Sequence, residues 1–399
     1  MVIGFDASRA FVSEPTGTEN YSYQLLKALS RIDHKNKYIV YVRNLSLATC
    51  HLSPNFKFKE IRWSRLWTQG GLALECLVNP PDVLFIPAHT LPVIRRPNLK
   101  TVVTIHDLGV EYLPQYHQFP QKYYLNWSTI YAVKNAVRII AVSQNTRKDL
   151  ITKLQCDTQV IRVIYEGVQP LHLKTKGVLE KYKVTKPFIL FVGTIQPRKN
   201  LVRLIEAFAT IARGPAPTFP PASARPPHSA RLRAVGSPSS RVTPRALSLV
   251  LVGKPGWLYE EIYAAPKRLG LSDKVKFLNF VPDDDLAILY KEASVFCLPS
   301  LYEGFGLPVL EAMAAGVPVV VSKTSSLPEV VGDAGVLVDP YNVNDITEGL
   351  KKVLENQSLR QTLIKKGRER AKKFNWEKTA RETLKVLEEA YKTKLKVKS

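Results

Sequence analysis

The sequence predicts an α/β protein made of two doubly wound domains, each built on a parallel sheet. Apolar runs alternate with helical patterns, and this alternation occurs twice, on either side of a polar stretch near residues 170–186. The runs are nearly continuous and rich in Val and Ile, which is typical of parallel strands buried on both faces. A chain of 399 residues with 45% hydrophobic content can supply two cores.

Five candidate strands with helices between them define the first domain, for which we predict residues 1–170. The strands are Val2–Asp6, Tyr38–Val42, Val83–Ile86, Thr101–Ile105 and Arg138–Val142, and the helices include Asn20–Ser30 and Lys122–Lys134. A polar linker, residues 171–186, is expected to follow.

The second domain is predicted to span residues 187–375 and to repeat the same alternation. Its strands are Phe188–Val192, Leu249–Val252, Val275–Leu278, Val295–Leu298 and Val317–Val321. The last helix, residues 376–391, carries apolar residues at helical spacing, and we expect it to pack back onto the first domain.

Residues 213–247 interrupt this rhythm between the helix Leu201–Ala212 and its next strand. The segment contains eight prolines and six arginines but no acidic residue. Connections of this kind are normally a few residues long. We interpret the segment as a disordered surface insertion, with a basic interaction arm as the alternative.

The composition limits the environment and the partners. The formal net charge is +23, which attracts polyanions unless the lysines are simply solvated. The four cysteines have no metal-ligand spacing, so free thiols in a reducing compartment fit best. We find no signal-peptide pattern and no apolar run long enough to cross a bilayer. These features favour a cytoplasmic protein.

The segment Leu301–Gly316 carries the clearest chemical signal. It places Glu303 on a glycine-rich loop and Glu311 on the first turn of a helix that begins at Pro308. Free N–H groups at a helix start favour a phosphate, and a carboxylate there can accept hydrogen bonds from a ribose diol. Together they suit a nucleotide-sugar. The alternative is a solvated loop whose second glutamate only favours the helix dipole.

A basic turn, residues 193–200, follows the first strand of the second domain. Arg198 and Lys199 would lie beyond the carboxyl end of a parallel strand, where folds of this class bind ligands. Cationic side chains there can neutralise a diphosphate. The turn is neither a Walker A nor a G-x-G-x-x-G motif, so a kinase or a dehydrogenase is disfavoured.

In this order, the motifs of both halves resemble retaining glycosyltransferases of family 4, which have the GT-B architecture and include many mannosyltransferases. The second half contains GTIQPRKN, LVLVGKPGW, VKFLNFVPDDDLAILY and SLYEGFGLPVLEAMAAGVPVV, and the first half contains GTENYSYQLLKAL, VVTIHDL, IIAVSQNTRKDL and VIYEGV. The resemblance covers nearly the whole chain except residues 213–247.

The resemblance implies roles for the residues around the E-x7-E segment. Glu311 would bind the ribose of the donor, and Glu303 would contact the donor sugar. The backbone of Phe305, Gly306 and Leu307 would place N–H groups near that sugar and the diphosphate.

The resemblance also assigns residues on the other side of the donor. Lys199 and Arg198 would hold the diphosphate, and His106 would face the transferred sugar, unless it is only a histidine satisfied at a strand end. Gly193 and Thr194 would border the donor; many family members carry Arg where this chain has Thr194, and we take Arg198 as its substitute. The loop under the donor phosphates would contain Gly17.

We expect no metal and no cofactor. Asp283, Asp284 and Asp285 invite a metal-ligand interpretation, but they follow Pro282 and open a predicted helix, Leu286–Ala293, where acidic residues favour the dipole. The resemblance implies that helix N-termini and basic side chains stabilise the diphosphate instead.

The segment Phe56–Trp67 mixes basic and aromatic residues. Trp63 and Trp67 would lie one helical turn apart beside Arg62 and Arg65, as on a helix that lies in an anionic headgroup layer. Packing of both tryptophans inside the domain is the alternative. Peripheral docking on the inner face of a membrane would give access to a lipid-linked acceptor.

We therefore predict a retaining hexosyltransferase. It would move a hexose, mannose first, from a nucleotide diphosphate sugar to a glycan or lipid-linked acceptor in cell-envelope polysaccharide or glycoconjugate synthesis. Two alternatives are kept: a phosphorylase or epimerase acting on activated sugars, and a basic nucleic-acid-binding protein. No nucleic-acid-binding motif is recognised, so nucleic acid is not expected as a partner.

Overall fold

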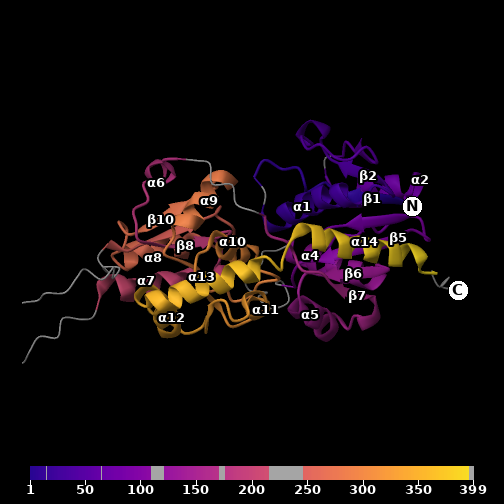
Figure 1. The fold of residues 1–399 in the computed structure, drawn as a ribbon. Coiled ribbons are helices and arrows are strands. Elements are labelled where there is room, and N and C mark those ends of the chain that lie inside the picture. Colours follow the sequence, from indigo (N-terminus) through magenta and orange to yellow (C-terminus); the bar gives the residue numbers. More distant parts are fainter. Residues whose placement is uncertain (15, 64, 109–120, 170–175, 215–245, 395–399) are drawn as a thin grey trace, which may run out of the picture.

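The computed structural model describes residues 1–14, 16–63, 65–108, 121–169, 176–214 and 246–394. These residues form two α/β domains side by side, joined by two crossings of the chain (Figure 1). The predicted fold class is confirmed by two parallel sheets with helices on both faces. Most of the predicted insertion at residues 213–247 lies outside the described residues.

The first sheet has seven parallel strands in the order β3-β2-β1-β4-β5-β6-β7. Its strands are β1 Val2–Asp6, β2 Lys37–Val42, β3 Phe56–Glu60, β4 Val83–Ile86, β5 Lys100–Ile105, β6 Arg138–Ala141 and β7 Ile161–Val163. Its helices are α1 Gly17–Ile32, α2 Ala73–Val78, α4 Gln121–Asn135 and α5 Gln144–Leu154.

The second sheet has six parallel strands in the order β10-β9-β8-β11-β12-β13. Its strands are β8 Phe188–Val192, β9 Ser248–Val252, β10 Val275–Leu278, β11 Val295–Leu298, β12 Val319–Ser322 and β13 Val336–Val338. The helices of this half are α6 Val178–Lys181, α7 Leu201–Arg213, α8 Glu260–Arg268, α9 Asp283–Glu292, α10 Leu307–Ala315, α11 Leu327–Val331, α12 Val343–Glu355, α13 Gln357–Ala371 and α14 Trp376–Lys392.

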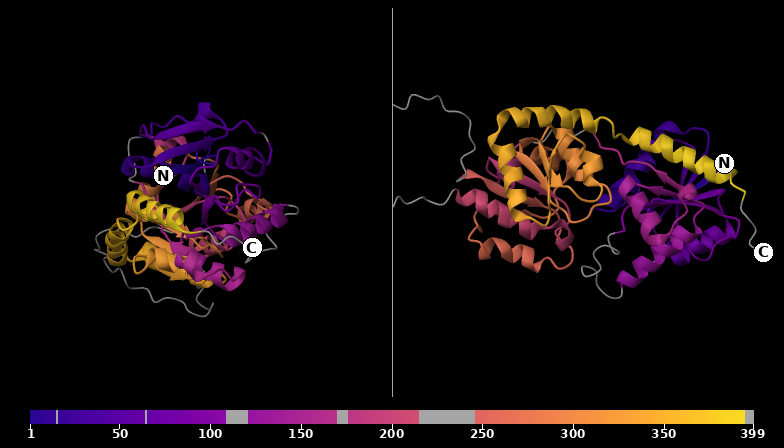
Figure 2. Two further views of the ribbon diagram at one scale, coloured as in Figure 1. Left: turned by 90° about the vertical axis from the view of Figure 1, so that its right-hand side faces the viewer. Right: turned by 90° about the horizontal axis from the view of Figure 1, so that it is seen from below.

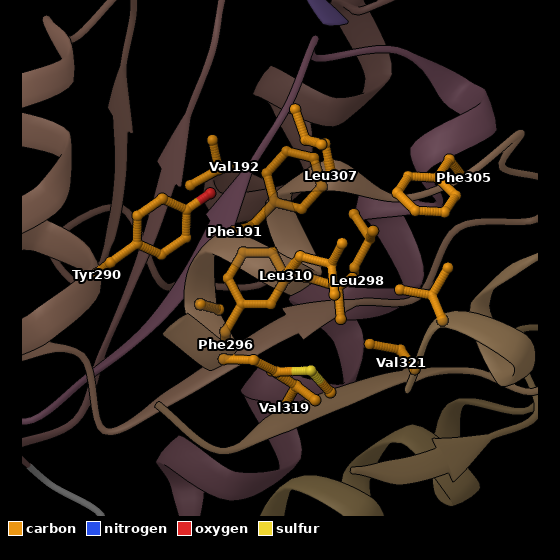
Figure 3. Packing of buried hydrophobic residues seen from close by; sticks show 14 of the residues in the cluster. Phe191, Val192, Tyr290, Phe296, Leu298, Phe305, Leu307, Leu310, Val319 and Val321 are labelled. Carbon is orange, nitrogen blue, oxygen red and sulfur yellow. The ribbon is translucent and has the colours of Figure 1, made fainter. Parts of the chain in front are cut away.

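Successive residues of a strand point to opposite faces of the sheet, and both faces are buried, as the Val- and Ile-rich runs require. In β5, Val102 packs with α1 and α14, whereas Val103 packs into the cluster that contains residues of α2, α4 and α5. In the second domain, Phe191, Phe296 and Leu310 pack together beneath the carboxyl ends of β8 and β11 (Figure 3). This packing gives the loops that follow those strands a rigid base.

The C-terminal helices join the two domains. Helix α13 packs on α10 in the second domain, and α14 packs on α1 and on β4, β5 and β6 in the first. Figure 2 shows these helices running from one domain to the other, so that α14 ends on the first domain, where the chain also begins. Within the expected linker, α6 packs against α9, where Lys181 and Tyr182 both donate to Asp285.

The structure differs from the sequence-based expectation in three places. Strands β3, β7 and β13 were not predicted; each is an edge strand of its sheet. Residues Phe56–Glu60 form a strand, so the expected amphipathic helix over Phe56–Trp67 is wrong. Trp67 is buried and donates to the carbonyl of Ile61, whereas Trp63 is exposed. Among the described residues, no helix combines the length and the apolar character needed to span a bilayer.

Shortening one buried side chain of α14 tests how much this helix stabilises the first domain. Leu387 is fully buried, so Leu387→Ala is expected to lower the free energy of unfolding by roughly 2–5 kcal/mol, because it leaves a cavity. Denaturant unfolding, followed by far-UV circular dichroism, measures the change. The exposed Lys385 provides the control Lys385→Ala, which should change little. Equal midpoints for the two variants would contradict the packing described here.

Candidate active site

The candidate site lies where strand order reverses in the second sheet. Strand β8 pairs with β9 on one side and with β11 on the other, and such a reversal opens a crevice at the carboxyl ends of the strands. The turn 193–200 follows β8, and the loop 299–306 follows β11. The two basic residues and the glutamate loop predicted from sequence therefore lie next to each other.

Hydrogen bonds fasten these two segments together. The N–H of Leu301 donates to the carbonyl of Arg198 at 2.9 Å. Asn200, held in the left-handed region at φ 59°, donates through Nδ2 to the carbonyls of Pro299 and Pro340. Because Asn tolerates this backbone conformation better than most residues, it can end the turn and begin α7 at the same place.

A buried group of charges occupies the junction. Lys199 is 8% exposed and Glu303 is 6% exposed, and Lys199 Nζ lies 2.5 Å from Glu303 Oε1. Arg198 Nη1 donates to the carbonyl of Tyr302 at 2.8 Å and lies 3.5 Å from Glu303 Oε2. Asp107 Oδ2, from the first domain, is 3.7 Å from the same guanidinium nitrogen.

Burial and charge act against each other at this group. Burial alone would raise the pKa of Glu303, but the charges of Lys199 and Arg198 outweigh it and hold that pKa below its ordinary value. Burial lowers the pKa of Lys199, although Glu303 opposes the change. The buried ammonium of Lys199 is poorly solvated. An anion placed beside it would therefore stabilise its charged form and would itself be bound favourably.

A cleft of about 890 Å³, open to solvent, lies on the side of α10. The charge group does not line it but reaches its wall at Gly193, where a Cβ would be 3.5 Å from Lys199 Cε. Its second-domain lining includes Gly193, Thr194, Asn279, Leu307 and Glu311, and its first-domain lining is Thr16, Gly17 and Asn20. A Cβ at Gly17 would meet no atom within 4 Å, so the start of α1 leaves free space toward the cleft.

Glu311 faces this cleft from the second turn of α10. The helix begins at Leu307 with Pro308 in its first turn, so the expectation that Glu311 lies on the first turn is wrong. Tyr290 donates to Glu311 Oε2 at 2.8 Å. Burial, helped by the charges of Asp283 and Glu166, raises the pKa of Glu311 to about 7 despite the bond from Tyr290.

The loop residues before α10 present backbone rather than side chains. Phe305 is buried and packs against Tyr165 and Phe374, with ring centroids 6.0 and 5.8 Å apart. Gly306 has φ 105°, a conformation that favours glycine. The helix N-terminus at Leu307 consequently opens directly onto the cleft, where free N–H groups can meet an anion.

His106 follows β5, and both of its ring nitrogens have partners. Nδ1 lies 3.2 Å from Glu166 Oε1, and Nε2 lies 3.0 Å from the carbonyl oxygen of Pro87. Burial lowers the pKa of His106, but Glu166 and the Pro87 carbonyl reverse the effect and raise it. His106 does not line the cleft that contains Glu311, and its ring is fixed by the first domain and the crossing segment.

The two domains meet tightly around the glutamate loop. A Cβ on Gly304 would lie 1.9 Å from the carbonyl oxygen of His106, so only glycine allows this approach. Tyr302 donates to Asp149 Oδ2 at 2.5 Å. In α11, Glu329 accepts from the backbone N–H groups of Gln144 and Asn145 at 3.0 Å each and thereby caps helix α5 of the other domain.

Sequence reasoning missed several residues of this region. It assigned no role to Glu166, which holds His106, and it did not consider Glu329. Lys254, in the motif after β9, lines the cleft and forms an ion pair with Glu14 of the first domain. Its place after a parallel strand could have suggested this position, whereas the Glu14 partner is set only by the docking of the domains.

Replacing Glu166 tests whether its carboxylate favours the protonated form of His106. Glu166→Gln should lower the pKa of His106, because the carboxylate that favours the protonated ring is lost; an NMR pH titration of the imidazole measures the change. A raised histidine pKa adds stability below its unfolded value, and this stability is lost as pH rises through the folded value. The variant should therefore lose more stability at acidic than at alkaline pH. The exposed Glu180 gives the control Glu180→Gln, and an unchanged titration in Glu166→Gln would refute the coupling.

Comparison with known proteins covers both halves of the chain. The sequence model "Glycosyltransferase Family 4" matches residues 15–170, and "Glycosyl transferases group 1" matches residues 237–370. The O-antigen chain mannosyltransferase B of Escherichia coli is 32% identical over 298 residues, which cover 71% of this chain and 69% of that protein. Some other E. coli mannosyltransferases that match are longer, and the alignment spans about a third of their length.

Solved structures share the fold over nearly the entire chain. Sucrose-phosphate synthase from Thermosynechococcus elongatus superposes with a TM-score of 0.75 at 20% identity, covering 98% of this chain and 99% of that one. Anabaena HepE in complex with UDP-glucose gives a TM-score of 0.70 at 17% identity, covering 98% and 100%. At these identities the likeness establishes the two-domain architecture.

Proposed function

The chain belongs to the family 4, group 1 glycosyltransferases, and on this premise we propose that it transfers a hexose, mannose first, from a nucleotide diphosphate sugar to a glycan or lipid-linked acceptor. The observation that carries the proposal is the buried Lys199–Arg198–Glu303 group beside the cleft that Glu311 lines. The mannosyltransferase activity named for the E. coli relative favours mannose. The complex of HepE with UDP-glucose supports an activated-sugar donor.

In the proposed complex, the donor would lie along the cleft between the domains. Glu311 would accept hydrogen bonds from the ribose hydroxyls, and the N-terminus of α10 would face the diphosphate. Gly17 leaves room for the phosphates on the side of the first domain. Lys199 and Arg198 would then bind the diphosphate end of the donor, so that Glu303 is left to contact the hydroxyls of the sugar.

Transfer would proceed by departure of the nucleoside diphosphate. The bond between the anomeric carbon and the β-phosphate oxygen breaks, and the acceptor oxygen forms a new bond to that carbon on the same face. The proton of the acceptor hydroxyl passes to the departing phosphate oxygen. Lys199 and Arg198 would stabilise the charge that develops on this oxygen, in preorganised positions with little access for water. Configuration at the anomeric carbon would be retained.

The same arrangement supports catalysis without a metal. Two basic side chains and a helix N-terminus would neutralise the negative charge of the diphosphate. They would thus provide the positive charge that a metal cation would otherwise supply. Asp283 and Asp284 lie in the first turn of α9, where their charge favours the helix dipole. We propose that donor binding is therefore independent of divalent cations.

A screen of donors tests this proposal. GDP-mannose, UDP-glucose and UDP-N-acetylglucosamine are added to the purified chain with EDTA present, and the shift in melting temperature is measured. One donor should stabilise the protein, since a ligand bound only by the folded state raises its stability. Glu311→Ala should abolish the shift because the ribose loses its acceptor.

The matched control is Glu348→Ala, which removes an exposed glutamate of α12. It should leave the shift unchanged. A donor found in this way is then incubated with mannosylated and lipid-linked acceptors, and the anomeric configuration of the product is read by NMR. An inverted product would contradict retention, and no shift with any nucleotide-sugar would contradict the proposed donor class.

A further inference from the structure

A group of large apolar side chains is exposed on one part of the first domain, which we call the apolar face. Its six members are 41–68% exposed. They are Trp63, Leu66, Leu74, Leu77, Val78 and Ile94. Isolated exposed apolar residues are common on protein surfaces, whereas a contiguous group of them marks an interaction site.

Helix α2 and the π-helical turn before it, Thr68–Leu72, form the centre of this face. Leu74, Leu77 and Val78 are spaced i, i+3 and i+4, so they project from one side of α2, while Ala73 and Cys76 are buried on the other side. The ring of Trp63 lies directly against the turn, because a Cβ on Gly70 would be 2.3 Å from Trp63 Nε1.

The loop 91–96 brings Ile94 to the same surface. Gln69 Nε2 donates to the carbonyl of Leu91 at 3.0 Å, and the N–H of Val93 donates to Gln69 Oε1 at 2.9 Å. Arg96 Nε donates to the carbonyl of Leu77 at 2.9 Å. The turn, α2 and the loop are thus fixed to one another.

The charges around the apolar face are predominantly basic. Its two nearby acids are already neutralised, since Glu75 pairs with Lys59 at 2.5 Å and Glu60 pairs with Arg62 at 2.7 Å. The exposed Arg65 forms no ion pair with any residue in the described part of the chain. Its charge, like that of Arg96, is available to an anionic partner.

We propose that the apolar face docks the protein onto an anionic lipid surface. Exposed Leu, Val and Trp side chains can enter the boundary between headgroups and acyl chains, while arginines beside them reach the phosphates. This combination of inserted apolar groups and surrounding positive charge matches a membrane better than it matches a polar protein surface. It replaces the amphipathic helix expected from sequence with a face assembled from three segments.

The apolar face extends along the first domain from the carboxyl ends of β3 and β4 toward the amino ends of the strands. Segments 61–67 and 87–96 begin where β3 and β4 end. The carboxyl ends of the first sheet are also where His106 follows β5, next to the glutamate loop. Trp63 and Leu66 therefore lie toward the carboxyl ends of the strands, whereas α2 lies near the start of β1, at the end of the first domain that faces away from the second (Figure 1).

Vesicle co-sedimentation of the full chain tests the proposal. Vesicles of phosphatidylcholine alone are compared with vesicles that also contain phosphatidylglycerol, at low and moderate salt. Wild type should sediment with the anionic vesicles, and Leu74→Ser/Leu77→Ser should weaken this binding by roughly ten-fold, because the inserted apolar area is lost. Arg65→Glu should also weaken it, most strongly at low salt.

The arginines of residues 213–247 would attract any anionic surface. Sedimentation of the wild type alone therefore does not identify the apolar face, and the comparison between wild type and variants does. Tyr341, which is 61% exposed on the second domain, gives the control Tyr341→Ser, which should sediment like wild type. Equal sedimentation of Leu74→Ser/Leu77→Ser and wild type, or no sedimentation of wild type, would overturn the proposal. A dimer in sedimentation velocity that this double variant converts to a monomer, without vesicle binding, would show a self-association face instead and would also overturn it.

Discussion

The pairing of two buried cations with one carboxylate governs the arrangement of the candidate site. Lys199 and Arg198 are withdrawn from water at the carboxyl end of β8, and a buried charge without a partner costs several kcal/mol. Glu303 provides the partner, with Lys199 Nζ 2.5 Å away. The loop after β11 must therefore fold back over the turn after β8, and the side chains of Arg198 and Asn200, which donate to the carbonyls of Tyr302 and Pro299, hold it there.

The docking of the two domains follows from the position of that loop. Tyr302 and Gly304 flank Glu303, and both contact the first domain, through Asp149 and through the carbonyl of His106. Glu329 adds a cap on α5, and α14 fixes the second crossing of the chain. The cleft walls consequently come from both domains, which is the arrangement required if closure of the domains completes a site.

The elements of the fold that sequence predicts best are the continuous Val- and Ile-rich strands, because burial on both faces leaves a strong pattern. The short strands β3, β7 and β13 lack it. Likewise, the neighbourhood of Lys199, Arg198 and Glu303 is predictable, since each follows a strand of one parallel sheet. The partners of His106 and of α5 are not, because Glu166 and Glu329 are distant from them in sequence. Glu166 reaches His106 from the segment after β7, and Glu329 reaches α5 only through the docking of the domains. Trp67 misled the prediction because a strand and a turn replace the assumed helix.

In the proposed function, the buried cations bind the diphosphate of a nucleotide donor. Calorimetric titration with GDP and GMP, and with UDP and UMP, measures the contribution of the second phosphate to affinity. The wild type should bind one diphosphate at least roughly ten-fold more tightly than its monophosphate, as charge-assisted contacts allow. In Lys199→Gln/Glu303→Gln, which removes the buried pair together, this preference should disappear while the protein stays folded. A preference of unchanged size in that variant would contradict the account.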